Sequence, residues 1–235
     1  DLAPYSGLGV WTDAFDFDER YVGGPPTVTP ADIPVMAAAA TETLFVQAAR
    51  LDDTATEPLI DAWLMADFLL TAHAHGIDVV GWYLPKWAEG DLGHLQAIAD
   101  FSVLGQRFDG LGVDIEWTKE VAPEARNASL VSLTEAIRAS APDLPLAAIV
   151  FPPVITDIIN QDLWPDFPWQ QLVDHYSVWM PMTYWSFRSE SSGWRDPYRY
   201  TSESVRLLRE NLGRPDAIVH PIGGIGALDG VDDPT

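Results

Sequence analysis

The chain has 235 residues, of which 47% are hydrophobic, so it is long enough to bury a sizeable core, and we expect a single domain spanning 1–235. Thirteen Lys and Arg residues against 35 Asp and Glu residues give a formal net charge of -22, which argues against nucleic acid and anionic lipid as partners because both would be repelled. There is no cysteine, which excludes disulfides and thiolate metal sites. No apolar run reaches about eighteen residues, so no membrane span is expected.

The chain begins at Asp1, with neither a methionine nor a basic and apolar leader. This start fits a mature secreted protein or an excised fragment, and the sequence leaves both alternatives open. We expect an extracellular or cell-surface location.

Predicted strands and helices alternate along the chain. Apolar runs bounded by turn residues predict seven strands, in chain order 7–13, 44–50, 77–84, 108–117, 144–151, 177–185 and 217–222. Cap residues and helical spacing of apolar side chains predict the helices between them, in chain order 30–41, 58–75, 91–105, 123–140, 169–175 and 201–213. Alternation with apolar strands implies a parallel sheet covered by helices.

Seven such units predict an α/β fold of the (β/α)8 TIM-barrel type, lacking the last β/α unit in this chain. The sequence stops at 232–235, soon after the seventh predicted strand. Either the true end is missing or the barrel closes incompletely. We favour a missing end, because an unclosed barrel would expose strand edges that proteins normally protect.

The segment 108–117 is the most informative, because it predicts a buried strand that ends in two carboxylates. Side chains alternate along a strand, so Gly112, Asp114 and Glu116 share one face and the apolar residues between them share the other. Two acids so close repel each other as anions, and partial burial disfavours charge further, so one of them should have a raised pKa and donate a proton near neutral pH. The alternative is that both acids are solvated or serve as caps.

In TIM barrels the catalytic groups come from the carboxyl ends of the strands and the loops that follow them. By that rule the candidate residues are Asp13, Gln47, Tyr83, Asp114, Glu116, Tyr184 and His220. Several tryptophans fall within or just after predicted strands: Trp11, Trp82, Trp117, Trp179 and Trp185. Indoles in such places either form stacking surfaces for sugar rings or belong to the core.

Neither the histidines nor the first acidic cluster forms a convincing metal site. His73 and His75 lie on different sides of a helix, where neighbouring side chains are three or four residues apart. Asp13, Asp16 and Asp18 lack the glycine and glutamate of a calcium-binding loop, which leaves surface solvation as the simpler interpretation.

The glycine-rich segment 223–226 is compatible with a phosphate cradle after the seventh strand. The negative net charge and the absence of a Gly-x-x-x-x-Gly-Lys pattern argue against that alternative. We therefore expect no metal and no other cofactor.

Two segments carry a family resemblance. Residues 109–116, Asp-Gly-Leu-Gly-Val-Asp-Ile-Glu, resemble the Asp-Gly-x-Asp-x-Asp-x-Glu signature of family 18 glycoside hydrolases, the chitinase family, with Gly112 in place of one acid. Residues 182–185, Met-Thr-Tyr-Trp, resemble that family's Met-x-Tyr-Asp, with Trp185 in place of the aspartate. The order of elements agrees over nearly the whole chain.

The resemblance implies a glycoside hydrolase that acts on a polysaccharide or glycan. Glu116 would be the general acid that protonates the leaving glycosidic oxygen, Asp114 would orient the acetamido group of the substrate, and Tyr184 would hydrogen-bond that group during substrate-assisted displacement. The residues expected to contact substrate are Trp11, Asp13, Gln47, Trp82, Tyr83, Met182 and Trp185.

The seventh predicted strand, 217–222, carries no acid, so a retaining mechanism with a second glutamate there is not available. The alternative function, of a different class, is a lectin-like carbohydrate-binding protein on the same barrel that has lost catalysis. The departures at Gly112 and Trp185 permit this alternative, because a shared barrel does not fix function.

Overall fold

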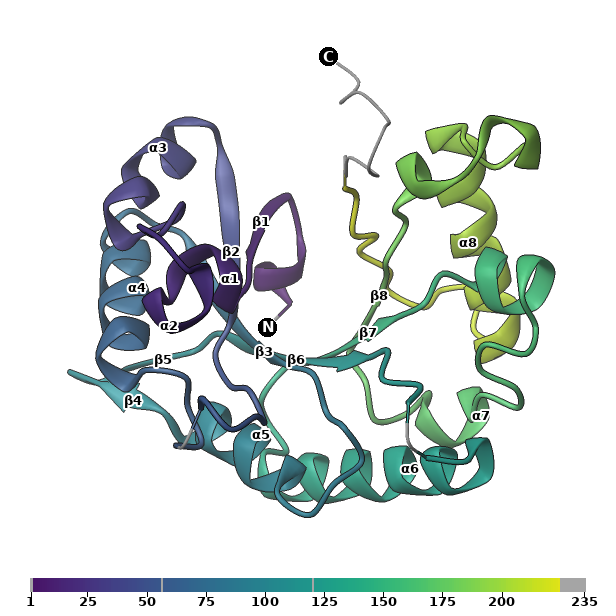
Figure 1. Cartoon of the computed structure of the whole chain (residues 1–235), viewed down its shortest axis with the longest axis horizontal. Helices are drawn as coiled ribbons and strands as arrows, with labels where there is room; N and C mark the ends of the chain where they lie inside the picture. The colour runs from purple at the N-terminus through teal and green to yellow at the C-terminus, as the bar shows by residue number, and fades with distance from the viewer. Residues whose placement is uncertain (1, 56, 120, 225–235) are drawn as a thin grey trace.

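Parallel strands at the centre of the fold curl into an open half-barrel (Figure 1). The computed structural model describes residues 2–55, 57–119 and 121–224. Within these residues the central sheet has six strands, in the order β1 (Leu8–Thr12), β2 (Thr41–Gln47), β3 (Asp78–Tyr83), β6 (Gly110–Ile115), β7 (Leu146–Val150) and β8 (Val178–Pro181). Every pair of neighbours is parallel. The predicted α/β fold with barrel-like alternation is confirmed.

Helices cover the outer face of this sheet (Figure 1). The α-helices are α1 (Ala14–Phe17), α2 (Glu19–Val22), α3 (Ile33–Ala38), α4 (Ala62–Ala74), α5 (Asp91–Asp100), α6 (Pro123–Ser140), α7 (Trp169–Leu172) and α8 (Pro197–Leu212). Shorter helical turns are η1 (Ala3–Tyr5), η2 (Pro30–Asp32), the π-helical η3 (Val154–Ile159), η4 (Trp185–Phe187) and η5 (Glu190–Ser192). No helix among the described residues is long and apolar enough to cross a bilayer.

The alternation along β6 divides its side chains between two cores. Leu111, Val113 and Ile115 belong to the large core between sheet and helices. The opposite face of the sheet forms a second, smaller core inside the curl, to which Trp82 and Ile149 belong. The strand therefore presents its even-numbered residues, Asp114 among them, to the inside of the half-barrel, as its sequence predicts.

Several predicted elements have different bounds in the structure, and left-handed residues explain two of the differences. The helix predicted over 30–41 ends at Ala38, and β2 begins at Thr41, because Ala40 adopts a left-handed conformation (φ 61°) that ends the helix. The helix predicted over 91–105 ends at Asp100. Left-handed Leu104 and Gly105 then form the turn of an unpredicted hairpin, β4 (Ser102–Val103) and β5 (Gln106–Arg107).

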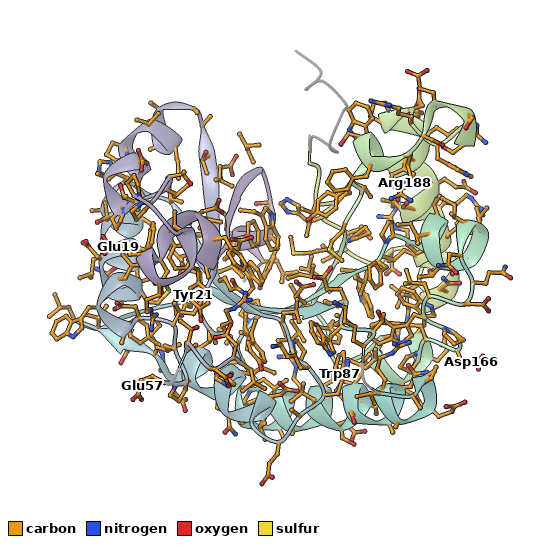
Figure 2. All side chains as sticks on the ribbon, viewed as in Figure 1. Glu19, Tyr21, Glu57, Trp87, Asp166 and Arg188 are labelled. Carbon is orange, nitrogen blue, oxygen red and sulfur yellow. The ribbon has the colours of Figure 1, made fainter. Side chains whose placement is uncertain are left out.

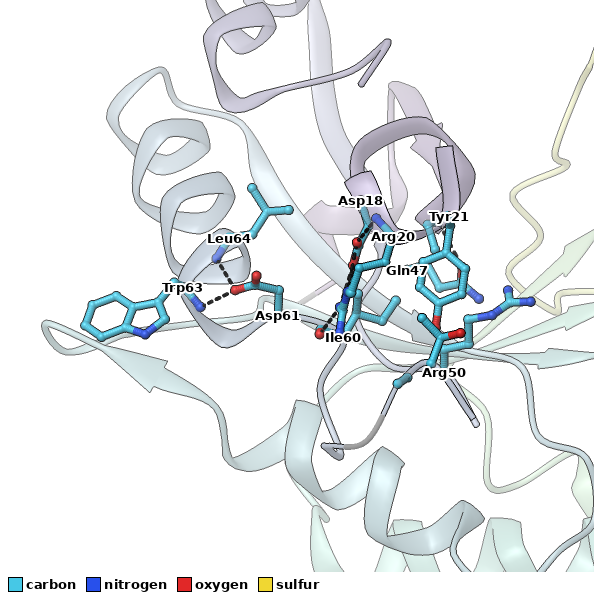
Figure 3. Close-up of polar contacts among 12 residues, drawn as sticks. Asp18, Arg20, Tyr21, Gln47, Arg50, Ile60, Asp61, Trp63 and Leu64 are labelled. Atoms are coloured by element: carbon cyan, nitrogen blue, oxygen red, sulfur yellow. Dashed lines mark hydrogen bonds and ion pairs between the residues drawn. The ribbon is translucent and has the colours of Figure 1, made fainter. Parts of the chain in front are cut away.

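Polar contacts fix the start of α4 and the loop before it (Figure 3). The Asp61 carboxylate accepts hydrogen bonds from the backbone N–H groups of Trp63 and Leu64, at 2.9 and 3.0 Å, and so caps the helix four residues after its predicted start. Arg20 pairs with the Asp18 carboxylate and also donates to the carbonyl of Ile60. The short α2 is thereby tied to the segment that follows β2.

The seventh predicted strand, 217–222, is reduced to two parallel bridges, Trp179 with Val219 and Met182 with Ile222. Within the described residues β1 pairs only with β2, so the half-barrel stays open along β1 (Figure 1). Ile225 and Gly226 of the glycine-rich segment, and the chain end at 232–235, lie outside the described residues.

The two wings of the half-barrel stand on either side of its open mouth. One wing carries α1 to α4 and the other carries α8 (Figure 1). Figure 2 shows Glu19 and Tyr21 in the first wing and Arg188 in the second.

Candidate active site

A pocket of about 260 Å³ lies where the carboxyl ends of the strands meet inside the half-barrel. Its volume is close to the lower end of the usual range for small-molecule sites, roughly 300 Å³. The lining residues come from five strands or the loops after them and from the segment 217–222; they are Trp11, Thr12, Asp13, Asp16, Trp82, Asp114, Glu116, Ile149, Met182, Tyr184 and Ile222. Seven of the ten residues proposed from the sequence for catalysis or substrate contact therefore lie together in this pocket.

Asp114 and Glu116 both line this pocket from the inner face of β6 and the residue just after it. Asp114 is only 7% exposed, and its Oδ1 is buried with no hydrogen-bond partner among the described residues. Burial, followed by the negative charge of Glu116, raises the pKa of Asp114 well above its ordinary value. Burial also raises the pKa of Glu116. The pair can therefore hold a proton at a pH where exposed carboxyls have lost theirs.

Tyr184 faces the same carboxylates from the loop after β8. Burial, and then the charges of Asp114, Glu116 and Asp13, raise its pKa to about 12, so the phenol remains a hydrogen-bond donor at neutral pH. Its ring packs edge-on against Phe187, with centroids 5.8 Å apart. A hydroxyl donor thus lies beside three carboxyl groups.

Asp13 brings a further carboxylate from the end of β1. Its Oδ1 accepts from the backbone N–H of Phe15 at 2.7 Å. Asp13 and Asp16 also form a reciprocal capping box at the start of α1, in which Asp16 Oδ2 accepts from the N–H of Asp13 at 2.9 Å and the Asp13 carboxylate accepts from the N–H of Asp16. Burial and then the charge of Asp16 raise the pKa of Asp13. Both acids are oriented by the backbone of α1, which the sequence spacing alone did not predict.

Two indoles form the apolar part of the lining. Trp11 stacks on Phe45 with centroids 4.4 Å apart and planes at 4°, and Trp82 lies 6.0 Å from Trp11. The Trp82 Nε1 is buried without a hydrogen-bond partner among the described residues. The lining therefore combines an aromatic wall with a few carboxyl groups, the mixture of apolar surface and placed polar groups that is typical of small-molecule sites.

Three of the proposed substrate contacts, and one further candidate, do not reach the pocket. The Gln47 side chain is buried, and its Oε1 accepts from the N–H of Ala14 at 3.0 Å. Tyr83 follows Trp82 directly and therefore faces the helices, where its hydroxyl donates to Asp91 at 2.6 Å. Trp185 is not in the lining and begins η4.

His220 lies close to the amino-terminal segment, with its Nδ1 2.8 Å from the carbonyl oxygen of Tyr5. The Tyr5 hydroxyl in turn donates to the carbonyl of Pro145, which precedes β7, at 3.1 Å. Because these contacts are at the amino ends of the strands, His220 lies away from the pocket at the carboxyl ends.

Sequence reasoning missed four lining residues, Thr12, Asp16, Ile149 and Ile222. Alternation along β7 could have identified Ile149 as an inner residue. Asp16 gave no such signal, because it lies in a helix whose start was not predicted. As to metals, no three acidic or histidine side chains within the described ranges are grouped closely enough to hold an ion.

The scan against protein-family models gave no match, and neither did the search of curated proteins. Solved structures do match in fold. A family 18 chitinase from Cycas revoluta in complex with (GlcNAc)3 is 15% identical with a TM-score of 0.60, over 93% of this chain and 68% of that chain. A chitinase from Chromobacterium violaceum is 14% identical with a TM-score of 0.53, over 92% of this chain and 68% of that chain.

An endo-1,4-beta-mannanase from Rhizomucor miehei is 7% identical with a TM-score of 0.60, over 86% of this chain and 74% of that chain. Chitinases and a mannanase thus match at similar scores and low identity. At such identities the similarity concerns the fold. The chain has the curled parallel sheet of TIM-barrel glycosidases, in a partial form.

Proposed function

We propose that this chain is a glycoside hydrolase that cleaves glycosidic bonds of a polysaccharide, with Glu116 as the general acid. The observation that carries the proposal is the carboxyl pair on the inner face of β6, which lines a pocket that also contains two indoles. Glycosidases use a protonated carboxyl to supply a proton to the leaving oxygen. The raised pKa of Glu116, caused by burial, favours the protonated form that this role needs.

Asp114 and Tyr184 suit an acetamido group on the sugar. The buried Asp114 Oδ1 has no partner among the described residues and can accept from an amide N–H, while the neutral Tyr184 hydroxyl can donate to the amide carbonyl. An amide held in this way is placed to attack the anomeric carbon of its own sugar, as Glu116 protonates the leaving oxygen. The acetamido oxygen would then form the new bond, and water would open the cyclic intermediate.

The second candidate function is carbohydrate binding without catalysis. It is favoured by the crowding at Gly112, where an added Cβ would lie 3.0 Å from both the Cβ of Trp82 and the Cδ1 of Ile149. No carboxylate fits there without a rearrangement, so Asp114 has no acidic neighbour on that side. A protein that only binds glycans has no need of such a neighbour.

One substitution separates the two functions. If Glu116 is the acid, Glu116→Gln removes turnover of a soluble chitin oligosaccharide by roughly 100-fold or more, while the affinity for that oligosaccharide stays within about twofold. Tyr198→Phe, at an exposed position outside the pocket, is the matched control. A wild-type protein that binds glycans and releases no product from any of them contradicts the hydrolase and supports the lectin-like function.

A further inference from the structure

The pocket contains more carboxyl groups than protonation of one glycosidic oxygen requires. Four of its lining residues are carboxylic acids, Asp13, Asp16, Asp114 and Glu116, and none of the described lining residues is Lys or Arg. Asp13 and Asp16 come from the first wing, whereas the carboxyl pair comes from the centre of the sheet. Any positive charge that offsets these carboxylates must therefore come from residues outside the lining or from a ligand.

The basic side chain that acts on Asp13 is already engaged. Arg50 pairs with the Asp52 carboxylate and lies against the rings of Phe15 and Tyr21, at 4.8 and 5.0 Å from their centroids. Figure 3 shows Arg50 beside Tyr21. The Tyr21 hydroxyl donates to the same Asp52 at 2.8 Å. Because these partners hold Arg50 outside the pocket lining, Asp13 has no ion-pair partner among the described residues.

The acids are also not arranged as a metal site. They come from α1 and β6, and within the described part of the chain no three acidic or histidine groups converge on one point. Asp114, more than nine-tenths buried and with an unpartnered Oδ1, lines the same pocket and lacks a donor. Buried acceptors without donors cost free energy, which a ligand that carries N–H groups would recover.

We infer that the substrate is a polysaccharide of amino sugars in which some amino groups are free and positively charged, and that Asp13 binds an ammonium group of this chain. The inference rests on the proposed function, and it specifies the substrate class of the same pocket. An acetamido-bearing unit would occupy the Asp114 and Tyr184 side, and a unit with a free amine would face Asp13. Neutral sugars would cover these acids without offsetting their charge, and anionic sugars would be repelled.

The Asp13 side chain has the geometry for this role. Its Oδ1 accepts from the backbone N–H of Phe15 at 2.7 Å, and its carboxylate also accepts from the backbone N–H of Asp16 in the capping box of α1. These two backbone bonds fix the side chain, and a carboxylate has about four lone-pair sites, so it can still accept from a ligand. Asparagine preserves the cap at this position, so Asp13→Asn removes the charge and keeps the fold of α1.

The test compares two β-1,4-linked glucosamine hexamers of equal length, one fully acetylated and one partly deacetylated. We expect wild-type kcat/KM to be about tenfold higher for the partly deacetylated hexamer at low ionic strength. This is the order of effect expected from one attractive charge pair, Asp13 with an ammonium group, in a partly exposed site. The preference should fall below about twofold in 1 M salt, where screening is nearly complete. Asp13→Asn should abolish it, while Glu135→Gln, an equal charge change at an exposed position on α6, should leave it intact.

Equal rates on both hexamers would overturn the inference and leave the proposed hydrolase standing. A preference that survives in Asp13→Asn would overturn the role of Asp13. If neither hexamer is cleaved, the proposed function fails, and calorimetric binding to the two hexamers still decides whether the pocket prefers the charged one. Circular dichroism of Asp13→Asn verifies that the variant is folded, and the salt dependence of the wild type tests the inference without any substitution.

Discussion

Gly112 on β6 lies directly beside Trp82 on β3, its register partner, and a Cβ built on Gly112 would be 3.0 Å from the Cβ of Trp82. The indole that lines the pocket and the glycine that departs from the family signature are therefore parts of one packing arrangement. A bulky residue at one position requires a minimal residue at the other.

Restoring an acid at this position should destabilise the protein. Gly112→Asp is expected to lower the free energy of unfolding by about 1–3 kcal/mol, because overpacking forces neighbours away. Part of the crowding comes from Ile149 Cδ1, also at 3.0 Å, so Ile149→Val should relieve part of the cost in the double variant. Urea denaturation of the four proteins measures this coupling, and a Gly112→Asp protein as stable as the wild type would contradict it.

Asp114 should make the stability of the fold depend on pH. Its folded-state pKa is raised by burial above the unfolded value of about 3.9, so its stabilising contribution is complete below that pH and is lost as pH rises through the folded-state pKa. Asparagine has no such titration. As pH rises through that window, the free energy of unfolding of Asp114→Asn minus that of the wild type should therefore increase, by up to about 1.4 kcal/mol per pH unit.

Melting curves from pH 4 to pH 8 provide the measurement for Asp114, with the exposed Glu135→Gln as the control for a change of one charge. Wild-type and Asp114→Asn stabilities that run parallel over this whole interval are the result that would refute the expectation. Such a result would mean that Asp114 ionises in the folded protein as readily as in the unfolded chain.

The hydrolytic rate should decline as Glu116 loses its proton. Since burial raises the pKa of Glu116, the alkaline limb of kcat/KM should lie above about 4.3, the ordinary value for glutamate. A pH–rate profile on a soluble oligosaccharide locates the limb. A limb at or below the ordinary value would show that a different group donates the proton.

Gln47 should contribute to the pocket indirectly, through the backbone of α1. Gln47→Leu leaves the N–H of Ala14 without its acceptor, which is expected to cost roughly 1–3 kcal/mol of stability and, because Asp13 is the adjacent residue, to raise KM. Thr134→Val is the matched control, since it removes the buried contact of Thr134 with the Tyr176 hydroxyl, on the helix layer. An unchanged KM in Gln47→Leu, alongside equal destabilisation in both variants, would limit Gln47 to a structural role.

Alternation along single strands gave the inner position of Asp114 and the outer position of its apolar neighbours, because side-chain direction in a strand depends only on residue number. The same rule separates Trp82 from Tyr83, which are consecutive and cannot both face the pocket. It does not reveal partners that come from elsewhere in the chain. Gln47 has the expected strand-end position, but its side-chain oxygen accepts a hydrogen bond from the N–H of Ala14 instead of facing the pocket.

Turns and one short helix explain most of the other differences between the predicted and the observed structure. Leu104 and Gly105 follow a helical pattern without a break in composition, yet their left-handed backbone forms a hairpin turn. The sequence indicates only a solvated surface acid at Asp16, because α1 is four residues long and has no helical periodicity to detect. Its place in the pocket depends on the reciprocal cap with Asp13, which the sequence spacing does not predict.

The nearness of Trp11 and Trp82 gives the pocket an optical reporter of its own. Both indoles line the cavity, with ring centroids 6.0 Å apart, so a sugar that displaces water from it alters the polarity around two fluorophores together. Emission from the unlabelled protein should shift as the ligand is titrated in. Replacing either indole by phenylalanine would then assign the signal to one wall of the cavity.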